Sequence, residues 1–280
     1  MLNKKANSKG KTISLHSYKG GTGKTTLISN LAAYYARNGL RVCLLDFDLY
    51  APSLAMYFRK KPTAYLNDLL KGETSSKGKT DISSLLVDVS SELGLDGKLF
   101  VGFSSPGKED IAEIELKHDQ KWQLAAIRRF LLAKNQLFEE YGIDYLFLDT
   151  SPGIRYWSIN TLAVADTIFL VMKNSDMDVE GTRKMTNDIY DSLTKFGSKY
   201  YIILNKISGA SPIDELNSQA DEREFERELE KSIGTRIVGS IPCFCDIQFN
   251  RHEFLFAIKK PDHPFSKKLV ALAEEISNLE

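Results

Sequence analysis

Short apolar runs recur along this chain and alternate with longer segments in which apolar residues return every three or four positions. The first pattern is typical of buried strands and the second of amphipathic helices. Because strands separated by helices imply βαβ units, the sequence predicts an α/β fold with a doubly wound, mostly parallel sheet flanked by helices. The strands are predicted near 12–17, 41–46, 99–103, 144–149, 167–172, 199–205 and 236–241, and the helices near 25–38, 121–141, 178–196, 218–233 and 264–279.

The chain has 280 residues and shows no internal repeat. This length is enough to bury a substantial core, so residues 1–280 are predicted to form a single domain, with 1–10 as a flexible tail and the polar run 71–80 as a loop. The tail is too polar for the apolar segment of a signal peptide. No stretch approaches the ~18 apolar residues of a transmembrane helix. We therefore expect a cytoplasmic protein.

A glycine-rich loop lies between the first predicted strand and the first predicted helix, which is the arrangement of a P-loop NTPase. Its glycines let backbone N–H groups and the helix N-terminus converge on phosphates. Lys24 is predicted to reach the β- and γ-phosphates of ATP, and the Thr25 hydroxyl to bind Mg²⁺. Lys19 is not needed for this cradle, so we expect its charge to point outward at the nucleotide of a second copy in a dimer. The loop residues expected to hold the nucleotide are Gly20, Gly21, Thr22, Gly23, Lys24, Thr25 and Thr26.

Carboxylates follow two of the predicted buried strands. Asp46 and Asp48 come after the run 41–45, and Asp149 comes after the run 145–148. The carboxyl ends of neighbouring strands meet at the ligand crevice of a doubly wound sheet, so both motifs are expected to face the phosphates. Asp149 is predicted to hold Mg²⁺ through water, with Asp46 as a further metal-side acid. The N–H of Gly153 lies where it could sense the γ-phosphate.

The choice of base follows from the sequence Asn205-Lys206-Ile207-Ser208. It begins like the Asn-Lys-x-Asp motif of guanine-binding GTPases, but serine stands where the aspartate is needed. Without that aspartate, guanine would bury hydrogen-bond donors that have no partner, which is costly. The sequence therefore favours adenine.

Together these motifs resemble the deviant Walker A ATPases of the ParA/MinD type, and their pattern is most similar to the MinD-like branch. The resemblance extends over nearly the whole chain and rests on residues 19–26, 46–54, 149–153, 204–206 and 241–242. It implies that Lys19 contacts nucleotide across a dimer interface and that Asp48 helps position the attacking water. It also implies two switch segments, 48–54 and 149–153.

The resemblance extends to the base. It implies that Asn205 contacts the adenine and places Pro242 at the nucleotide as well; the alternative for Asn205 is that it only closes a turn at the end of a strand. One departure is visible, because Thr150-Ser151-Pro152-Gly153 stands where MinD itself commonly has Ser-Pro-Ala-Gly.

The charge of the chain and its last predicted helix indicate whether it binds nucleic acid or membranes. Lys+Arg and Asp+Glu each number 37, so no large field attracts nucleic acid or anionic lipid. Two lysine clusters are either solvated or a surface for weak DNA contact. Membrane-bound MinD proteins end in a basic amphipathic helix, whereas glutamates share the polar side of the helix near 264–279, so we expect no intrinsic membrane anchor. The clusters are Lys4, Lys5, Lys9 and Lys11, and Lys259, Lys260, Lys267 and Lys268.

Cysteines and one tryptophan leave alternatives open. Cys43 lies in a predicted core strand and behaves as a small apolar residue. Cys243 and Cys245 are either a metal site or structural or reactive thiols, and their Cys-x-Cys spacing departs from the Cys-x-x-Cys of relatives that carry iron–sulfur clusters. Trp157, after the second switch, is either part of an interaction hot spot or packed in its own domain.

Two functional classes remain. In the first, the protein is a slow ATPase that dimerises on binding ATP and positions or partitions cellular cargo, with a protein partner that activates hydrolysis or is itself the cargo. In the second, it is an ATP-dependent factor that matures or delivers a metal cluster or a client protein.

Overall fold

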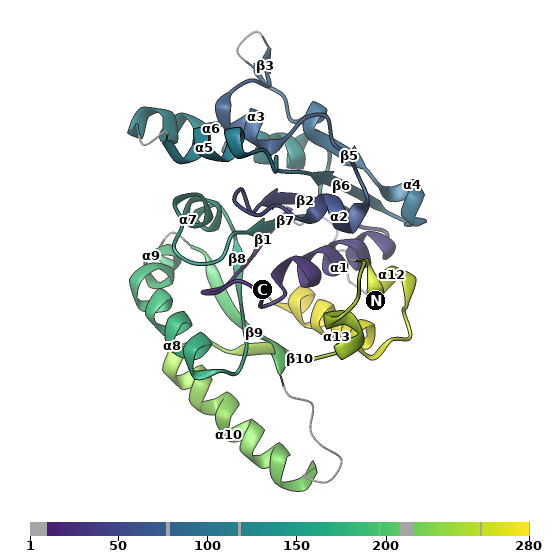
Figure 1. Ribbon diagram of the computed structural model, residues 1–280, viewed down its shortest axis with the longest axis vertical. Helices are drawn as coiled ribbons and strands as arrows, with labels where there is room; N and C mark the ends of the chain where they lie inside the picture. Colours follow the sequence, from purple (N-terminus) through teal and green to yellow (C-terminus); the bar gives the residue numbers. More distant parts are fainter. Residues whose placement is uncertain are drawn as a thin grey trace.

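The computed structural model describes residues 10–76, 79–116, 119–195, 197–207, 215–252 and 254–279. An eight-stranded sheet has the order β10-β9-β8-β1-β7-β2-β6-β5, and only the β5–β6 pair is antiparallel (Figure 1). The predicted α/β, mostly parallel fold is therefore confirmed. The strands are β1 (Lys11–His16), β2 (Arg41–Phe47), β5 (Leu86–Asp88), β6 (Lys98–Gly102), β7 (Tyr145–Thr150), β8 (Thr167–Met172), β9 (Lys199–Ile207) and β10 (Ile237–Pro242).

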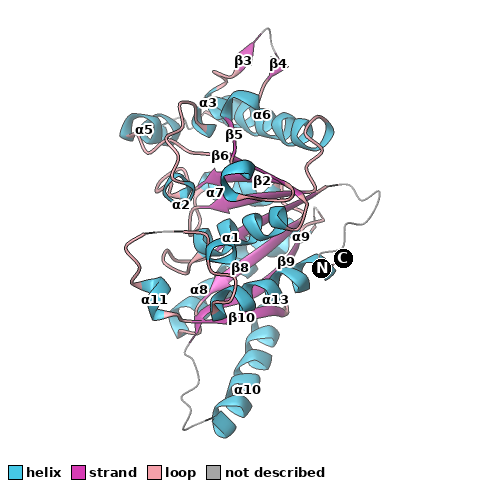
Figure 2. Cartoon of the chain, turned by 90° about the vertical axis from the view of Figure 1, so that its right-hand side faces the viewer, coloured by secondary structure: helices cyan, strands magenta, loops and turns pink. Residues whose placement is uncertain are grey.

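Helices cover both faces of the sheet because successive side chains of each central strand point to opposite sides. In β2, Val42 and Leu44 belong to the core cluster that includes α1 and α13, whereas Cys43 and Leu45 belong to the cluster that includes α3 and α6. Figure 2 shows α3 and α6 at one end of the molecule and α10 at the other. The longer helices are α1 (Lys24–Arg37), α5 (Lys108–Leu116), α6 (Gln120–Glu139), α7 (Tyr156–Ala163), α8 (Asp176–Met185), α10 (Glu215–Ile233) and α13 (Pro264–Asn278).

The predicted elements are present, with bounds that differ by a few residues. The predicted helix near 178–196 is divided, since α8 passes through a π-helical turn (Thr186–Tyr190) into α9 (Asp191–Thr194). The run 71–80 is not all loop: Lys71 ends α3, and β3 and β4 pair as antiparallel strands, while residues 77 and 78 lie outside the described residues. The flexible tail predicted for 1–10 lies outside the described residues except for Gly10. The sequence did not predict β5, α5 or α7. It also did not predict the short elements, which are α2 (Leu54–Phe58), α3 (Leu66–Lys71), β3 (Ser75–Ser76), β4 (Lys79–Thr80), a 3-10 turn (Ser83–Leu85), α4 (Ser90–Leu93), α11 (Cys245–Gln248) and α12 (Phe256–Lys259).

The last helix, α13, packs into the core. Phe265, Leu269, Leu272 and Ile276 are all buried in the cluster that also contains α1. Its apolar stripe is therefore covered by its own domain, as the sequence predicted. Among the described residues, no helix has the length and apolar character needed to cross a bilayer.

Candidate nucleotide-binding site

The glycine-rich loop joins β1 to α1 at the carboxyl edge of the sheet. Gly21 (φ +77°) and Gly23 (φ +92°) both adopt left-handed backbone conformations, which glycine reaches without steric cost. A Cβ atom at position 23 would lie 2.4 Å from the side-chain nitrogen of Asn205. The loop thus needs glycine at this position both for its turn and for its close contact with the end of β9. Of the other predicted loop residues, Gly20 is exposed and Thr22 is buried.

The two lysines of the loop have different surroundings. Lys24 is 7% exposed, and its Nζ donates to Ser17 Oγ at 2.8 Å. Burial lowers the pKa of Lys24, while the charges of Asp149 and Asp48 raise it. Lys19 instead points to the surface, where its Nζ lies 3.5 Å from Sδ of Met177 at the start of α8. One lysine of the loop is therefore buried, whereas the amine of the other lies at the surface.

Two buried carboxylates lie side by side across the β2–β7 pair, where Asp46 is in register with Asp149. Asp149 Oδ2 accepts a hydrogen bond from Thr25 Oγ1 at 2.7 Å, and its Oδ1 has no partner among the described residues. Burial raises the pKa of Asp149 to about 6, and burial together with the charge of Asp149 raises the pKa of Asp46 well above its usual range. The pair therefore carries an electrostatic cost in the absence of a cation.

This donor set fits Mg²⁺, which prefers oxygen ligands and is held by one or two carboxylates. The buried, unpartnered Oδ1 of Asp149 is the observation that supports the fit. Thr25 and Asp149 would hold the ion. Asp46 would stand behind them, because its two oxygens accept from the backbone N–H groups of Asp48 and Leu54 and so fold the segment 48–54.

The two predicted switch segments touch each other and the phosphate loop. Asp48 Oδ1 accepts from Ser151 Oγ at 2.7 Å and from Ala51 N–H at 3.1 Å. Gly153, with φ +74°, donates its N–H to the Ser17 carbonyl at 2.8 Å. The structure thus brings Asp48 and Gly153 to the same edge as Lys24. The motif analysis included Ser151 in a switch segment but assigned no role to Ser151 or Ser17, although the pairing of the two strands would have placed Ser151 beside Asp48.

A buried histidine, His16, contacts Thr150 in the second switch segment. His16 Nδ1 lies 2.9 Å from Thr150 Oγ1, and Thr150 in turn donates to the Leu15 carbonyl at 2.8 Å. Burial and the charge of Lys24 lower the pKa of His16 to about 3, so the ring is neutral at physiological pH. A neutral ring beside Lys24 avoids a second buried positive charge at the phosphate cradle.

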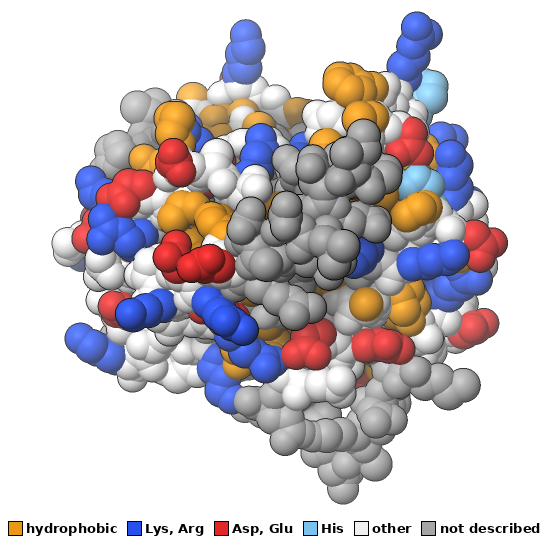
Figure 3. Space-filling model, turned by 90° about the horizontal axis from the view of Figure 1, so that it is seen from below, with side chains coloured by type: hydrophobic (Ala, Val, Ile, Leu, Met, Phe, Trp, Pro, Cys, Tyr) orange, Lys and Arg blue, Asp and Glu red, His pale blue; other side chains and the backbone are white. Residues whose placement is uncertain are grey.

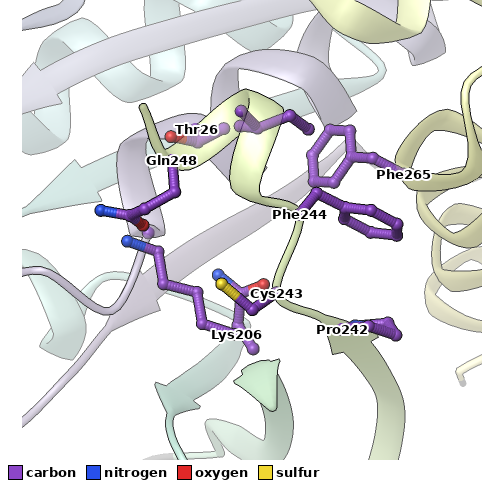
Figure 4. Close-up of a pocket in the computed structure, with 10 residues that line it drawn as sticks. Thr26, Lys206, Pro242, Cys243, Phe244, Gln248 and Phe265 are labelled. Atoms are coloured by element: carbon purple, nitrogen blue, oxygen red, sulfur yellow. The ribbon is translucent and has the colours of Figure 1, made fainter. Parts of the chain in front are cut away.

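A cavity of about 100 Å³ opens beside the phosphate loop, between the ends of β9 and β10. Asn205 lines the cavity, is buried, and donates to the Thr22 carbonyl at 2.7 Å. Lys206 has a positive φ of 57°, and its Nζ donates to the Gly21 carbonyl at 3.1 Å. In Figure 4, Lys206 and Gln248 point toward each other across from the rings of Phe244 and Phe265. The lining residues are Gly23, Thr26, Asn205, Lys206, Pro242, Cys243, Phe244, Ile247, Gln248 and Phe265.

The cavity is lined by four of the predicted nucleotide-binding residues, Gly23, Thr26, Asn205 and Pro242. In this structure Asn205 also ties the strand end to the phosphate loop, so both of its predicted roles are compatible with its position. Ser208, on which the exclusion of guanine rests, lies outside the described residues.

Comparison with known proteins agrees with this geometry. The profile described as AAA domain matches residues 10–199. The chain belongs to this family. Its ParA/MinD-type character, predicted from the motifs, is confirmed by related sequences and folds.

Two proteins with similar sequences have different names and lengths of match. The chromosome-partitioning ATPase Soj of Treponema pallidum is 29% identical over 175 residues, which cover 61% of this chain and 60% of Soj. The iron-sulfur cluster carrier protein of Aquifex aeolicus is 25% identical over 278 residues, which cover 95% of this chain and 67% of the carrier. The chain thus matches less than two thirds of the length of Soj.

Solved structures show the same fold. The cell division ATPase MinD of Pyrococcus furiosus matches with a TM-score of 0.72 at 22% identity, over 97% of this chain and all of MinD. MinD of Pyrococcus horikoshii, complexed with Mg-ADP, matches with a TM-score of 0.71 at 20% identity, over 96% of both chains. The predicted P-loop NTPase fold is confirmed.

The structure decides the alternative that was open for Trp157. Trp157 is 3% exposed and packs edge-on against Trp122, with ring centres 5.9 Å apart, so it belongs to the core of its own domain. Cys43 is buried, and burial raises the pKa of its thiol. Cys243 and Cys245 are exposed, and within the described residues no group of three or more His, Cys, Asp or Glu side chains could hold a metal ion.

Proposed function

We propose that this AAA-domain chain binds Mg²⁺ and ATP at the described site, dimerises on binding ATP, and hydrolyses it slowly. The observation that carries the proposal is the separation of the two lysines, because Lys24 lies inside the cradle while the amine of Lys19 lies at the surface. A cation that faces outward from a phosphate loop is available to a nucleotide held by a second copy. Family membership supports the ATPase activity.

Exposed apolar side chains near the carboxyl ends of the strands support dimerisation, and one of them, Met177, lies 3.5 Å from Lys19 Nζ. They follow the carboxyl ends of β2, β7 and β8, which are the strands nearest to the loop after β1. Exposed apolar groups gathered at one edge are typical of interaction sites. Burying them between two copies would also exclude water from the phosphates, which strengthens the interactions of charged groups there. These side chains are Met56 (65% exposed), Ile154 (57%), Tyr156 (42%) and Met177 (67%).

The chain's own residues suggest how hydrolysis is divided among them. Lys24 and the N–H groups of residues 20–25 would hold the phosphates, and Thr25 with Asp149 would hold the metal, which neutralises charge at the transferred phosphate when bound. Asp48 lies at the same edge and has an oxygen, Oδ2, without a hydrogen bond from the described residues. We assign to it the positioning of the attacking water. Lys19 would stabilise charge across the interface.

We propose spatial organisation of cargo as the biological role, in keeping with the partitioning and division proteins that this chain resembles. A protein partner would activate hydrolysis or be the cargo. Figure 3 shows Lys and Arg side chains interspersed with Asp and Glu on one face, so any DNA contact is expected to be weak there. The alternative is delivery of a metal cluster or client protein, for which the exposed thiols of Cys243 and Cys245 are the candidate ligands. Metal analysis of anaerobically purified protein discriminates the two roles.

The experiment that tests the proposed chemistry is the Asp48→Ala variant. Because a water-positioning group acts mainly on the transition state, phosphate release is expected to slow by about 100-fold or more while ATP affinity changes less than about threefold. Asp188→Ala, which removes an exposed carboxylate beyond α8, is the matched control and should hydrolyse ATP normally. If Asp48→Ala weakens ATP binding and leaves the turnover of bound ATP unchanged, Asp48 is a binding residue and the proposed chemistry is wrong.

A further inference from the structure

Ser151 and Asp48 leave neighbouring strands at the same level. In the β2–β7 pair, Phe47 is in register with Thr150, so the next residue of each strand lies beside the other. Ser151 is 1% exposed, and its Oγ donates to Asp48 Oδ1 at 2.7 Å.

We propose that Ser151 is a positioning residue for ATP hydrolysis, which orients the carboxylate of Asp48 and couples the two switch segments. This inference rests on the proposed function. Ser151 Oγ and the Ala51 N–H both donate to Oδ1 of Asp48, so that oxygen is fixed from both segments. Oδ2 accepts no hydrogen bond from the described residues and is left to accept one from the attacking water.

Hydrogen bonds on both sides of Ser151 fix the backbone that carries its hydroxyl. The Ser151 carbonyl accepts from Ser158 Oγ at 3.0 Å, which ties it to the first turn of α7. Two residues on, Gly153 N–H donates to the Ser17 carbonyl, and Ser17 Oγ accepts from Lys24. A hydroxyl on a backbone fixed at both ends orients its acceptor with little further loss of entropy, which is the condition for effective positioning. The same connections link Asp48 to the lysine of the phosphate loop.

The test is a double-mutant cycle of Ser151→Ala and Asp48→Asn. A hydrogen bond to a charged group contributes about 1.5–3 kcal/mol, which corresponds to a loss of about tenfold or more in kcat for Ser151→Ala. We expect KM for ATP to change less than about twofold, because Ser151 does not line the base cavity. In the Asp48→Asn background the same Ser151→Ala change should have no further effect, because the carboxylate that it orients is gone.

Thr161→Val is the matched control, since it removes a buried hydroxyl of α7 that donates to the Trp157 carbonyl and contacts neither Ser151 nor Asp48. It is expected to keep kcat within about twofold. Thermal unfolding establishes that each variant is folded, and Ser151→Gly provides the same deletion should the alanine variant fail to fold. Hydrogen exchange should increase in both 48–54 and 151–155 when the hydroxyl is removed.

Two results would overturn the role of Ser151 alone. In one, Ser151→Ala hydrolyses ATP at the natural rate; in the other, it slows turnover by the same factor with and without the Asp48 carboxylate, which indicates a general structural effect. A natural chain that binds ATP and does not hydrolyse it would instead overturn the proposed function, and this inference with it. The natural chain measured beside the variants distinguishes these failures.

Discussion

Replacing Asp149 by asparagine is expected to change how the stability of the nucleotide-free protein depends on pH. The carboxyl is fully buried beside Asp46, and burial raises its pKa from 3.8 to about 6. Because the folded state holds this proton more tightly than the unfolded chain, the free energy of unfolding falls as pH rises from about 4 to about 6. Above that range the carboxylate is ionised in both states and its destabilising effect is fully present.

The size of the effect follows from the shift in pKa. A difference of about two units between folded and unfolded chains corresponds to about 3 kcal/mol. An asparagine side chain at this position would keep the shape and the acceptor for Thr25 Oγ1 but carry no charge. We therefore expect the asparagine variant to gain about 3 kcal/mol in unfolding free energy relative to the natural chain as pH rises from about 4 to about 7. Relief of Asp46, whose pKa is raised in part by Asp149, acts in the same direction.

Urea unfolding with EDTA, measured at intervals of half a pH unit, gives the two profiles. Asp166→Asn is the control, because Asp166 accepts from Thr12 N–H at the opposite edge of the sheet and asparagine keeps that acceptor. It should follow the pH profile of the natural chain. Adding Mg²⁺ and ADP at pH 7 should stabilise the natural chain and have a smaller effect on Asp149→Asn. Parallel pH profiles for the natural chain and Asp149→Asn would refute the assignment of a strained metal-side carboxylate.

Three further predictions concern the loop, the base cavity and the surface. Gly23→Ala should lower the free energy of unfolding, measured by chemical denaturation, by about 2–4 kcal/mol, because alanine is strained in the left-handed backbone conformation and its Cβ would displace Asn205. The control is Gly39→Ala, which has the same left-handed backbone but no atom within 4 Å of the new Cβ, and which should lower the free energy of unfolding by about 1–2 kcal/mol. ATP should protect Cys243, which lines the cavity, from alkylation by N-ethylmaleimide, while Cys245 reacts at the same rate with and without ATP; equal protection or none, measured on the single Cys→Ser variants, would place the base elsewhere. ATP-loaded protein should stay in the supernatant with anionic vesicles because the apolar stripe of α13 is buried, and ATP-dependent co-sedimentation would contradict this.

Hydrophobic patterning was sufficient to predict seven of the eight strands of the sheet, all but β5. Buried parallel strands are nearly continuous apolar runs, so segments such as 41–47 and 145–150 are recognisable without a structure. The short elements between them were not predicted, because helices of four to six residues, such as α2 and α11, carry too few periods to show a pattern. The π-helical turn at Thr186–Tyr190 was also missed, since tertiary packing rather than composition determines it.

The candidate site was predictable where chemistry requires a particular residue type. Lys24, Thr25 and Asp149 come together as their motifs indicated, because motif residues follow the ends of adjacent strands. No role was predicted for Ser17 or Ser151, because a serine has no distinctive pattern in sequence and its role depends on its neighbours in the fold. Strand order and register were the missing information, since β2 and β7 are about 100 residues apart in sequence yet place Asp48 beside Ser151.

The most direct test of the proposed ATP-dependent dimer is the molar mass of the Asp48→Ala protein in solution, measured by light scattering with Mg²⁺ and either ATP or ADP. We expect twice the monomer mass with ATP and the monomer mass with ADP. Lys19→Ala in the same background should bind ATP through the intact Lys24 cradle and remain a monomer. A monomer mass with saturating ATP, or a Lys19→Ala variant that dimerises as well as its parent, would contradict the role of Lys19 across a dimer interface.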